Sequence, residues 1–148
     1  MGTFNIEQEI SRNPREVFAV LSDVSAMPLW YEAVKKVVAL TPGGVTGLGA
    51  RFEIGRTLPG GSVVNEVAVT EFVPEQCFAV ESVSGPTPFR YRYTLEPATG
   101  MTRLRLEGRI TGEGLPGPLA HIDTVVTQLF KRGMGDNLRK LKQLIEAK

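Results

Sequence analysis

Apolar and polar side chains alternate strictly from Phe89 to Glu96, and this period of two constrains the fold more than any other feature of the chain. The apolar set is Phe89, Tyr91, Tyr93 and Leu95, and the polar set is Arg90, Arg92, Thr94 and Glu96. Successive side chains of a strand point to opposite faces. The pattern therefore predicts a strand with one buried and one solvated face.

The same alternation recurs from Met101 to Thr111, which predicts a partner strand. We expect the four residues Pro97–Gly100 to form the connecting loop. The resulting cross-strand pairs are Tyr93 with Leu104, Tyr91 with Leu106, Arg90 with Glu107, and Arg92 with Arg105. The apolar side chains of both strands then lie on the same face of the hairpin. The two paired arginines repel each other, so we expect one of them to turn toward another partner.

Six consecutive strands are predicted between residues 34 and 111, because the period of two persists across this region. They are Val34–Leu40, Ala50–Leu58, Ser62–Phe72, Cys77–Val83, Phe89–Glu96 and Met101–Thr111. Short segments rich in Gly and Pro separate them, as is typical of an antiparallel meander. With a first strand at Thr3–Ile10, the sheet has about seven strands.

Two short helices are expected after the first strand. Asn13 suits the N-cap, Pro14 suits the first helical position, and Glu16 can complete a capping box. This helix should end by Ser22 or Asp23, and Met27–Tyr31 forms a turn or a second short helix.

A helical period returns after residue 118 and continues to the C-terminus. An apolar stripe from Leu119 to Leu144 predicts a helix of about 28 residues. Gly133 and Gly135 weaken its middle by up to about 1 kcal/mol each relative to Ala. We therefore expect a bend or a close backbone approach at these glycines.

Length and composition exclude several classes of protein. A chain of 148 residues is one ordinary domain, which we assign to residues 1–148. With 17 basic and 16 acidic residues the net charge is +1, too small to favour nucleic acid. One Cys and one His provide no metal site, and we expect no cofactor. No secretory signal and no apolar run of about 18 residues is present, so we expect a cytoplasmic protein without integral membrane contact. The sequence does not decide whether the protein forms a homodimer.

Several segments, taken in order, resemble the START-like or SRPBCC superfamily, near its polyketide cyclase/dehydrase-type members. The segments are Asn13-Pro14-Arg15-Glu16-Val17-Phe18, Leu21-Ser22-Asp23, Trp30, Gly47-Leu48-Gly49, Glu71-Phe72-Val73-Pro74 and Gly100–Leu104. Each is also ordinary cap, strand or turn chemistry, so their order and spacing carry the resemblance. It implies an α+β helix-grip fold, in which a curved antiparallel sheet wraps around the long C-terminal helix.

The resemblance also implies a cavity between the sheet and this helix, which relatives use for lipids, sterols or polyketides. The candidate lining residues are those on the inward face of the strands and on the apolar stripe of the helix. Each of them could instead pack in the hydrophobic core without touching a ligand. They are Trp30, Phe52, Ile54, Val67, Phe78, Tyr91, Tyr93, Leu104, Leu106, Ile122, Val126, Leu129 and Phe130.

Polar candidates are few. An inward Tyr91 or Tyr93 hydroxyl needs a partner, which is a ligand oxygen, a water or a backbone carbonyl. Arg56 and Asn65 share the parity of the inward set, but both lie near the Pro59-Gly60-Gly61 turn, where solvated side chains are more common. His121 has no second ligand or nucleophile nearby in sequence, so we expect a partly exposed helix residue.

Two functions follow from these expectations. The first is binding of a small hydrophobic molecule, such as a lipid or polyketide, in the cavity. The alternative is a polyketide cyclase or aromatase, in which a Tyr, Arg or Asn polarises a carbonyl group. No catalytic residue can be assigned from the sequence. A third class, a subunit-contact module using the outer sheet face, is disfavoured by the alternating charges on that face.

Overall fold

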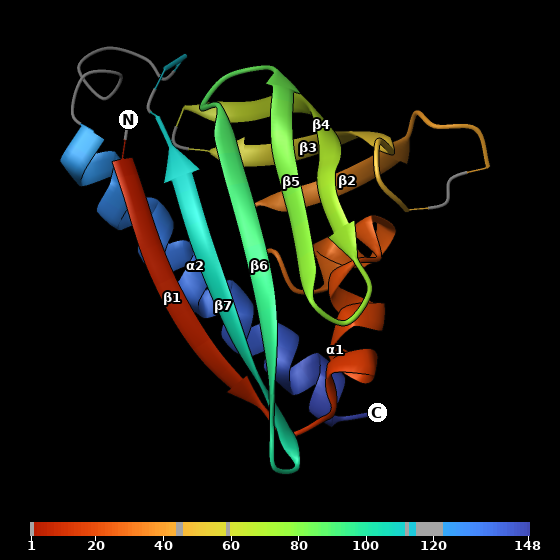
Figure 1. Cartoon of the computed structure of the whole chain (residues 1–148). Helices are drawn as coiled ribbons and strands as arrows, with labels where there is room; N and C mark the ends of the chain where they lie inside the picture. Colours follow the sequence, from red (N-terminus) through yellow and green to blue (C-terminus); the bar gives the residue numbers. More distant parts are fainter. Residues whose placement is uncertain (1, 44–45, 59, 112, 115–122) are drawn as a thin grey trace.

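The last six strands pair with their neighbours in chain order, and the first strand lies at one edge of the sheet, beside the last strand. The computed structural model describes residues 2–43, 46–58, 60–111, 113–114 and 123–148. The seven-stranded antiparallel sheet has the order β1-β7-β6-β5-β4-β3-β2 (Figure 1). Its strands are β1 (Gly2–Ile10), β2 (Val34–Ala39), β3 (Arg51–Leu58), β4 (Gly61–Val73), β5 (Cys77–Ser84), β6 (Phe89–Ala98) and β7 (Met101–Ile110).

The sheet curves around α2 (Asp123–Glu146), which crosses behind β6 and β7 in Figure 1. The buried side chains of α2 recur at helical spacing and meet the inward side chains of the strands. They include Val126, Met134, Leu138, Leu141 and Ile145. The predicted α+β helix-grip architecture is confirmed.

Two short helices lie between β1 and β2, as expected. In α1 (Pro14–Leu21) the Asn13 side chain accepts a hydrogen bond of 2.9 Å from the Glu16 amide, so the N-cap prediction is confirmed. The 3-10 helix η1 (Val24–Leu29) follows and begins three residues before the predicted turn.

The predicted register of the last hairpin is wrong by two residues. Ala98 pairs with Met101, so the turn contains only Thr99 and Gly100, and Tyr93 pairs with Leu106. Pairing continues through Pro97 because β5 ends its pairing with β6 at Thr94, and a proline is tolerated where a strand has one neighbour only. A shift of two residues preserves the faces, so the apolar face is the predicted one.

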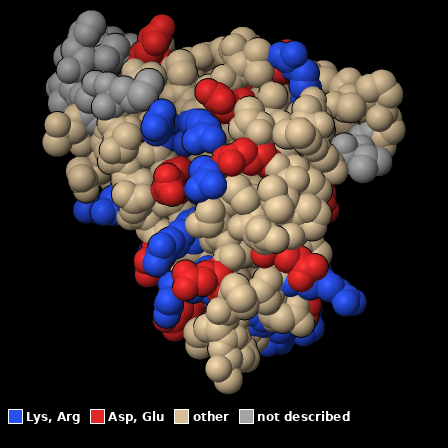
Figure 2. All heavy atoms as spheres, viewed as in Figure 1, with Lys and Arg blue, Asp and Glu red and all other residues tan. Residues whose placement is uncertain are grey.

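The shifted register also changes the expected charge pairs. Arg92 faces Glu107, with 3.6 Å between Nη1 and Oε1, and donates from Nε to Glu71 Oε2 at 2.7 Å. Arg90 shares the Glu71 carboxylate at 2.9 Å. The outer face of the sheet therefore carries interleaved charges of both signs, which Figure 2 shows along the front of the molecule.

The C-terminal helix differs in part from its prediction. It is an unbroken α-helix of 24 residues through Gly133 and Gly135. A Cβ at Gly133 would meet no atom within 4 Å, so the expected close backbone approach is wrong. The predicted start at Leu119, with His121, lies outside the described residues. No helix in the described ranges is long and apolar enough to cross a membrane.

Candidate functional site

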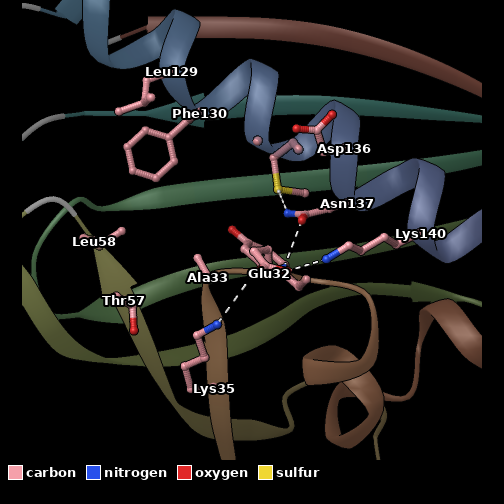
Figure 3. Close-up of a pocket in the computed structure, with 13 residues that line it drawn as sticks. Glu32, Ala33, Lys35, Thr57, Leu58, Leu129, Phe130, Asp136, Asn137 and Lys140 are labelled. Atoms are coloured by element: carbon pink, nitrogen blue, oxygen red, sulfur yellow. Dashed lines mark hydrogen bonds and ion pairs between the residues drawn. The ribbon is translucent and has the colours of Figure 1, made fainter.

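A pocket of about 680 Å³ opens between the middle of α2, the end of β3 and the turn at residues 31–33 (Figure 3). We call it the α2 pocket. Its apolar walls are Ala33, Leu58, Leu129, Phe130 and Met134, and its polar lining is Tyr31, Glu32, Lys35, Thr57, Asp136, Asn137 and Lys140, with Gly133 between them. A volume of this size is typical of sites for small molecules.

Helical spacing explains which residues of α2 reach the pocket. Phe130, Met134 and Asn137 follow one another at intervals of four and three, so they share one face of the helix. Gly133 lies in the same wall, where a side chain would project into open space. Leu129 is 50% exposed, so an apolar side chain stands at the solvent side of the pocket.

A hydrogen bond and an ion pair connect the turn at residues 31–33 to α2. The Glu32 amide donates to Asn137 Oδ1 at 3.0 Å, and the Glu32 carboxylate forms an ion pair with Lys140 (Figure 3). Lys140 holds the pKa of Glu32 below its usual value, with a smaller contribution from Lys35. These contacts fix the distance between two walls of the pocket.

Tyr31 forms a wall that the α2 pocket shares with a second, much smaller space. That space, which we call the tyrosine void, has a volume of about 10 Å³. It is lined by Met27, Tyr31, Ile54, Val67, Val80, Phe89, Tyr91 and Tyr93. Such a volume is close to the minimum that holds one water molecule. The room for a larger molecule therefore lies in the α2 pocket.

Beside these aromatic rings lies a fully buried arginine. Arg56 is 1% exposed and donates from Nε and Nη2 to Asn65 Oδ1, at 3.0 and 2.7 Å. Its Nη2 also donates to the Pro86 carbonyl at 3.0 Å and to Thr87 Oγ1 at 2.5 Å. Its guanidinium carbon lies 4.9 Å from the centre of the Phe89 ring. We call these five residues the Arg56 cluster.

The expectation that Arg56 and Asn65 lie at solvated strand ends is wrong. Both side chains are buried because the segment after β5 folds over them: the Asn65 amide donates to the Ser84 and Pro86 carbonyls, at 3.2 and 2.8 Å. Thr87 adopts a positive φ of 49°, which is rare for a β-branched residue. Backbone strain of this kind persists only where surrounding contacts impose it, and here it places the Thr87 hydroxyl on Arg56.

The Tyr91 hydroxyl is buried and has no hydrogen-bond partner among the described residues. Burial raises the pKa of Tyr91 well above its usual value, and the nearby Tyr31 phenol adds to the rise. Burial also raises the pKa of Tyr31, an effect that the neighbouring Arg56 charge partly offsets. Both phenols therefore keep their protons at neutral pH and are hydrogen-bond donors.

The structure distributes the predicted cavity residues over three places. Leu129 and Phe130 line the α2 pocket, and Ile54, Val67, Tyr91 and Tyr93 line the tyrosine void. Trp30, Phe52, Phe78, Leu104, Leu106 and Val126 are buried in the core. Ile122 lies outside the described residues.

Sequence reasoning missed most of the polar lining of the α2 pocket. Asn137 and Lys140 continue the helical spacing that identified Phe130, so this signal was available in the sequence. Tyr31 and Glu32 carried no such signal, because they lie far from α2 in sequence; the Glu32–Asn137 hydrogen bond spans 105 residues of chain.

Comparison with known proteins gives the family. A model for the family of polyketide cyclase/dehydrase and lipid transport proteins matches residues 1–146. The chain belongs to this family. No curated protein sequence matches it significantly.

Solved structures share the fold at low sequence identity. A protein from Thermus thermophilus superposes with a TM-score of 0.82 at 16% identity, covering 99% of this chain and 98% of the other. A START superfamily protein from Mycobacterium smegmatis gives 0.79 at 17% identity, covering 98% and 97%. The Zhui aromatase/cyclase from a Streptomyces species gives 0.80 at 12% identity, covering 98% and 93%. This architecture is thus shared by proteins of distant sequence.

Proposed function

We propose that this protein, as one START-like domain over residues 1–148, binds a small hydrophobic ligand such as a lipid or a polyketide. The α2 pocket carries the proposal, because it combines a volume of about 680 Å³ with a wall of apolar side chains. Each 100 Å² of apolar ligand surface removed from water there contributes about 2.5 kcal/mol to binding. The START superfamily and aromatase/cyclase structures of the same fold support this assignment.

The single tryptophan of the chain provides a direct test. Trp30 is 1% exposed and adjoins Tyr31, which lines the α2 pocket. N-phenyl-1-naphthylamine is uncharged and apolar and absorbs where tryptophan emits. We expect it to bind with energy transfer from Trp30, and dodecanol to displace it.

Matched leucine variants assign the binding to the α2 pocket. Leu129→Gln places a polar group in the pocket wall, whereas Leu48→Gln changes a leucine that is 72% exposed and does not line it. We expect Leu129→Gln to weaken probe binding about tenfold, since it removes about 1–2 kcal/mol of apolar contact. Equal affinities of the two variants would place the probe elsewhere, and absence of energy transfer in the parent protein would contradict the proposal.

A cyclase activity on the same ligand is the second candidate, favoured by the unpartnered Tyr91 hydroxyl near a buried cation. The phenol O–H would donate to a ketone oxygen of the substrate, and Arg56 would stabilise the charge that develops on that oxygen. Incubation with a linear poly-β-ketone distinguishes the two candidates. A cyclase releases a ring product with loss of one water, whereas a binding protein returns the ketone unchanged.

A further inference from the structure

Arg56 is a buried cation without an anionic partner. No carboxylate in the described part of the chain lies within 4.0 Å of its guanidinium, whereas four arginines of β6 and β7 and Arg51 of β3 form ion pairs. Arginine keeps its charge in proteins. An ion removed from water costs several kcal/mol unless an opposite charge compensates it.

The neighbours of Arg56 orient this charge without neutralising it. Its acceptors are the Asn65 amide oxygen, the Pro86 carbonyl and the Thr87 hydroxyl, all of which are uncharged. The Phe89 ring adds an attraction to the cation from its face. None of the four hydrogen bonds uses Nη1. The Arg56 cluster thus holds a positive charge in place and leaves donor capacity on one side.

A second buried donor lies at the same place. Tyr91 is 1% exposed, its hydroxyl is unpartnered, and its ring stacks on Phe89 with 5.0 Å between the ring centres. The tyrosine void adjoins this ring. Tyr31 lines both the void and the α2 pocket, so it lies between the two spaces.

We propose that the hydrophobic ligand carries a carboxylate, which displaces the Tyr31 side chain, enlarges the tyrosine void and is held between Arg56 and the Tyr91 hydroxyl. This inference rests on the proposed function and adds the ligand class and its orientation. The apolar tail lies along Leu129 and Phe130, and the carboxylate supplies the charge that Arg56 lacks. The competing arrangement has the carboxylate at the pocket rim, on the exposed Lys35 or Lys140.

Displacement of N-phenyl-1-naphthylamine by dodecanoic acid and by dodecanol, followed at pH 7.4, tests the ligand class. The two competitors share one chain and differ in their head group. We expect the acid to displace the probe at about 10- to 100-fold lower concentration than the alcohol, as hydrogen bonds to a charged group imply. This preference should disappear in Arg56→Gln and persist in the control Lys35→Gln.

Two further measurements keep the inference testable if Arg56→Gln fails to fold. Tyr91→Phe removes only an unpartnered hydroxyl, so we expect it to fold and to lose several-fold of the preference for the acid. In the parent protein, nuclear Overhauser contacts of bound dodecanoic acid should join its C2 protons to the Tyr91 and Phe89 rings.

The outcomes separate this inference from the proposed function. Equal displacement by acid and alcohol, or C2 protons beside Lys35 or Lys140, would overturn the inference while hydrophobic binding stands. Failure of both competitors to displace the probe would count against the proposed function itself.

Discussion

Gly85 lies so close to Asn65 that a Cβ on the glycine would fall 2.7 Å from the Asn65 amide nitrogen and 2.6 Å from the Val64 carbonyl oxygen. Its φ of +106° also disfavours any other residue. The absence of a side chain at Gly85 lets the segment after β5 fold over Asn65, whose side-chain amide donates to the Ser84 and Pro86 carbonyls.

We expect Gly85→Ala to destabilise the protein by about 2–4 kcal/mol, because it adds a steric clash to backbone strain. Gly49→Ala is the matched control, since Gly49 has a φ of +83° and open space around its Cβ position. That control should cost about 1–2 kcal/mol. Urea unfolding measures both, and equal losses would show that the clash is relieved at no cost.

Gly108 on β7 makes room for the Phe4 ring of β1, which a Cβ at Gly108 would contact too closely. Gly108→Ala should therefore destabilise the protein by about 1–3 kcal/mol through overpacking. Phe4→Leu leaves space for the added methyl group, so the double variant should lose less than the sum of the two single losses. Additive losses in urea unfolding would show that the two sites do not interact.

Gly133 and Gly135 lie in one helix, but only Gly133 lines the α2 pocket. Gly133→Leu should fill part of the pocket and weaken N-phenyl-1-naphthylamine binding at least tenfold, while helix propensity stabilises the fold by up to about 1 kcal/mol. Gly135→Leu should give the same stability gain with unchanged binding. Loss of binding in both variants would mean that helix stiffness, rather than pocket volume, controls entry.

Glu146 anchors the end of α2, where its Oε2 accepts from Lys142 at 2.6 Å and from the Ser11 amide at 2.8 Å. These bonds hold the pKa of Glu146 below the ordinary value of 4.5. A lowered folded-state pKa contributes stability above the unfolded value, and this contribution is lost as pH falls through the folded value. The free energy of unfolding should therefore decline below pH 4.5, and Glu146→Gln should reduce the steepness of the decline. A variant that follows the parent over this range would show that Glu146 is not linked to stability.

The strand faces could be predicted because alternation needs no knowledge of the partner strand. Tyr91, Tyr93 and Leu104 are buried as their parity requires, even though the hairpin register was wrong. Register depends on where pairing stops, and Pro97 stays paired only because β5 has already ended. That information is tertiary and is not present in the hairpin sequence.

The Arg56 cluster could not be predicted for a related reason. Alternation along the strand puts Arg56 on the same face as Phe52 and Ile54, but its position near a glycine turn predicts an exposed side chain. Burial depends on the backbone of Gly85 and Thr87, both at positive φ, which no periodicity encodes. Leu129 and Phe130 were accessible to sequence reasoning because a helical stripe is local, whereas the Glu32–Asn137 contact is not.

The strand order has a consequence for the sequence of folding events. The strands from β2 to β7 pair with their neighbours in the chain, whereas β1 pairs with β7 across most of the sequence. Local hairpins close with a smaller entropy loss than distant pairs, so the meander should form early and the docking of β1 and α2 late. The α2 pocket has walls from both stages, because residues 31–33 and β3 meet α2 there. A meander to which α2 has not yet docked lacks one wall of the pocket, so we expect the ligand to bind only after α2 has docked on the sheet.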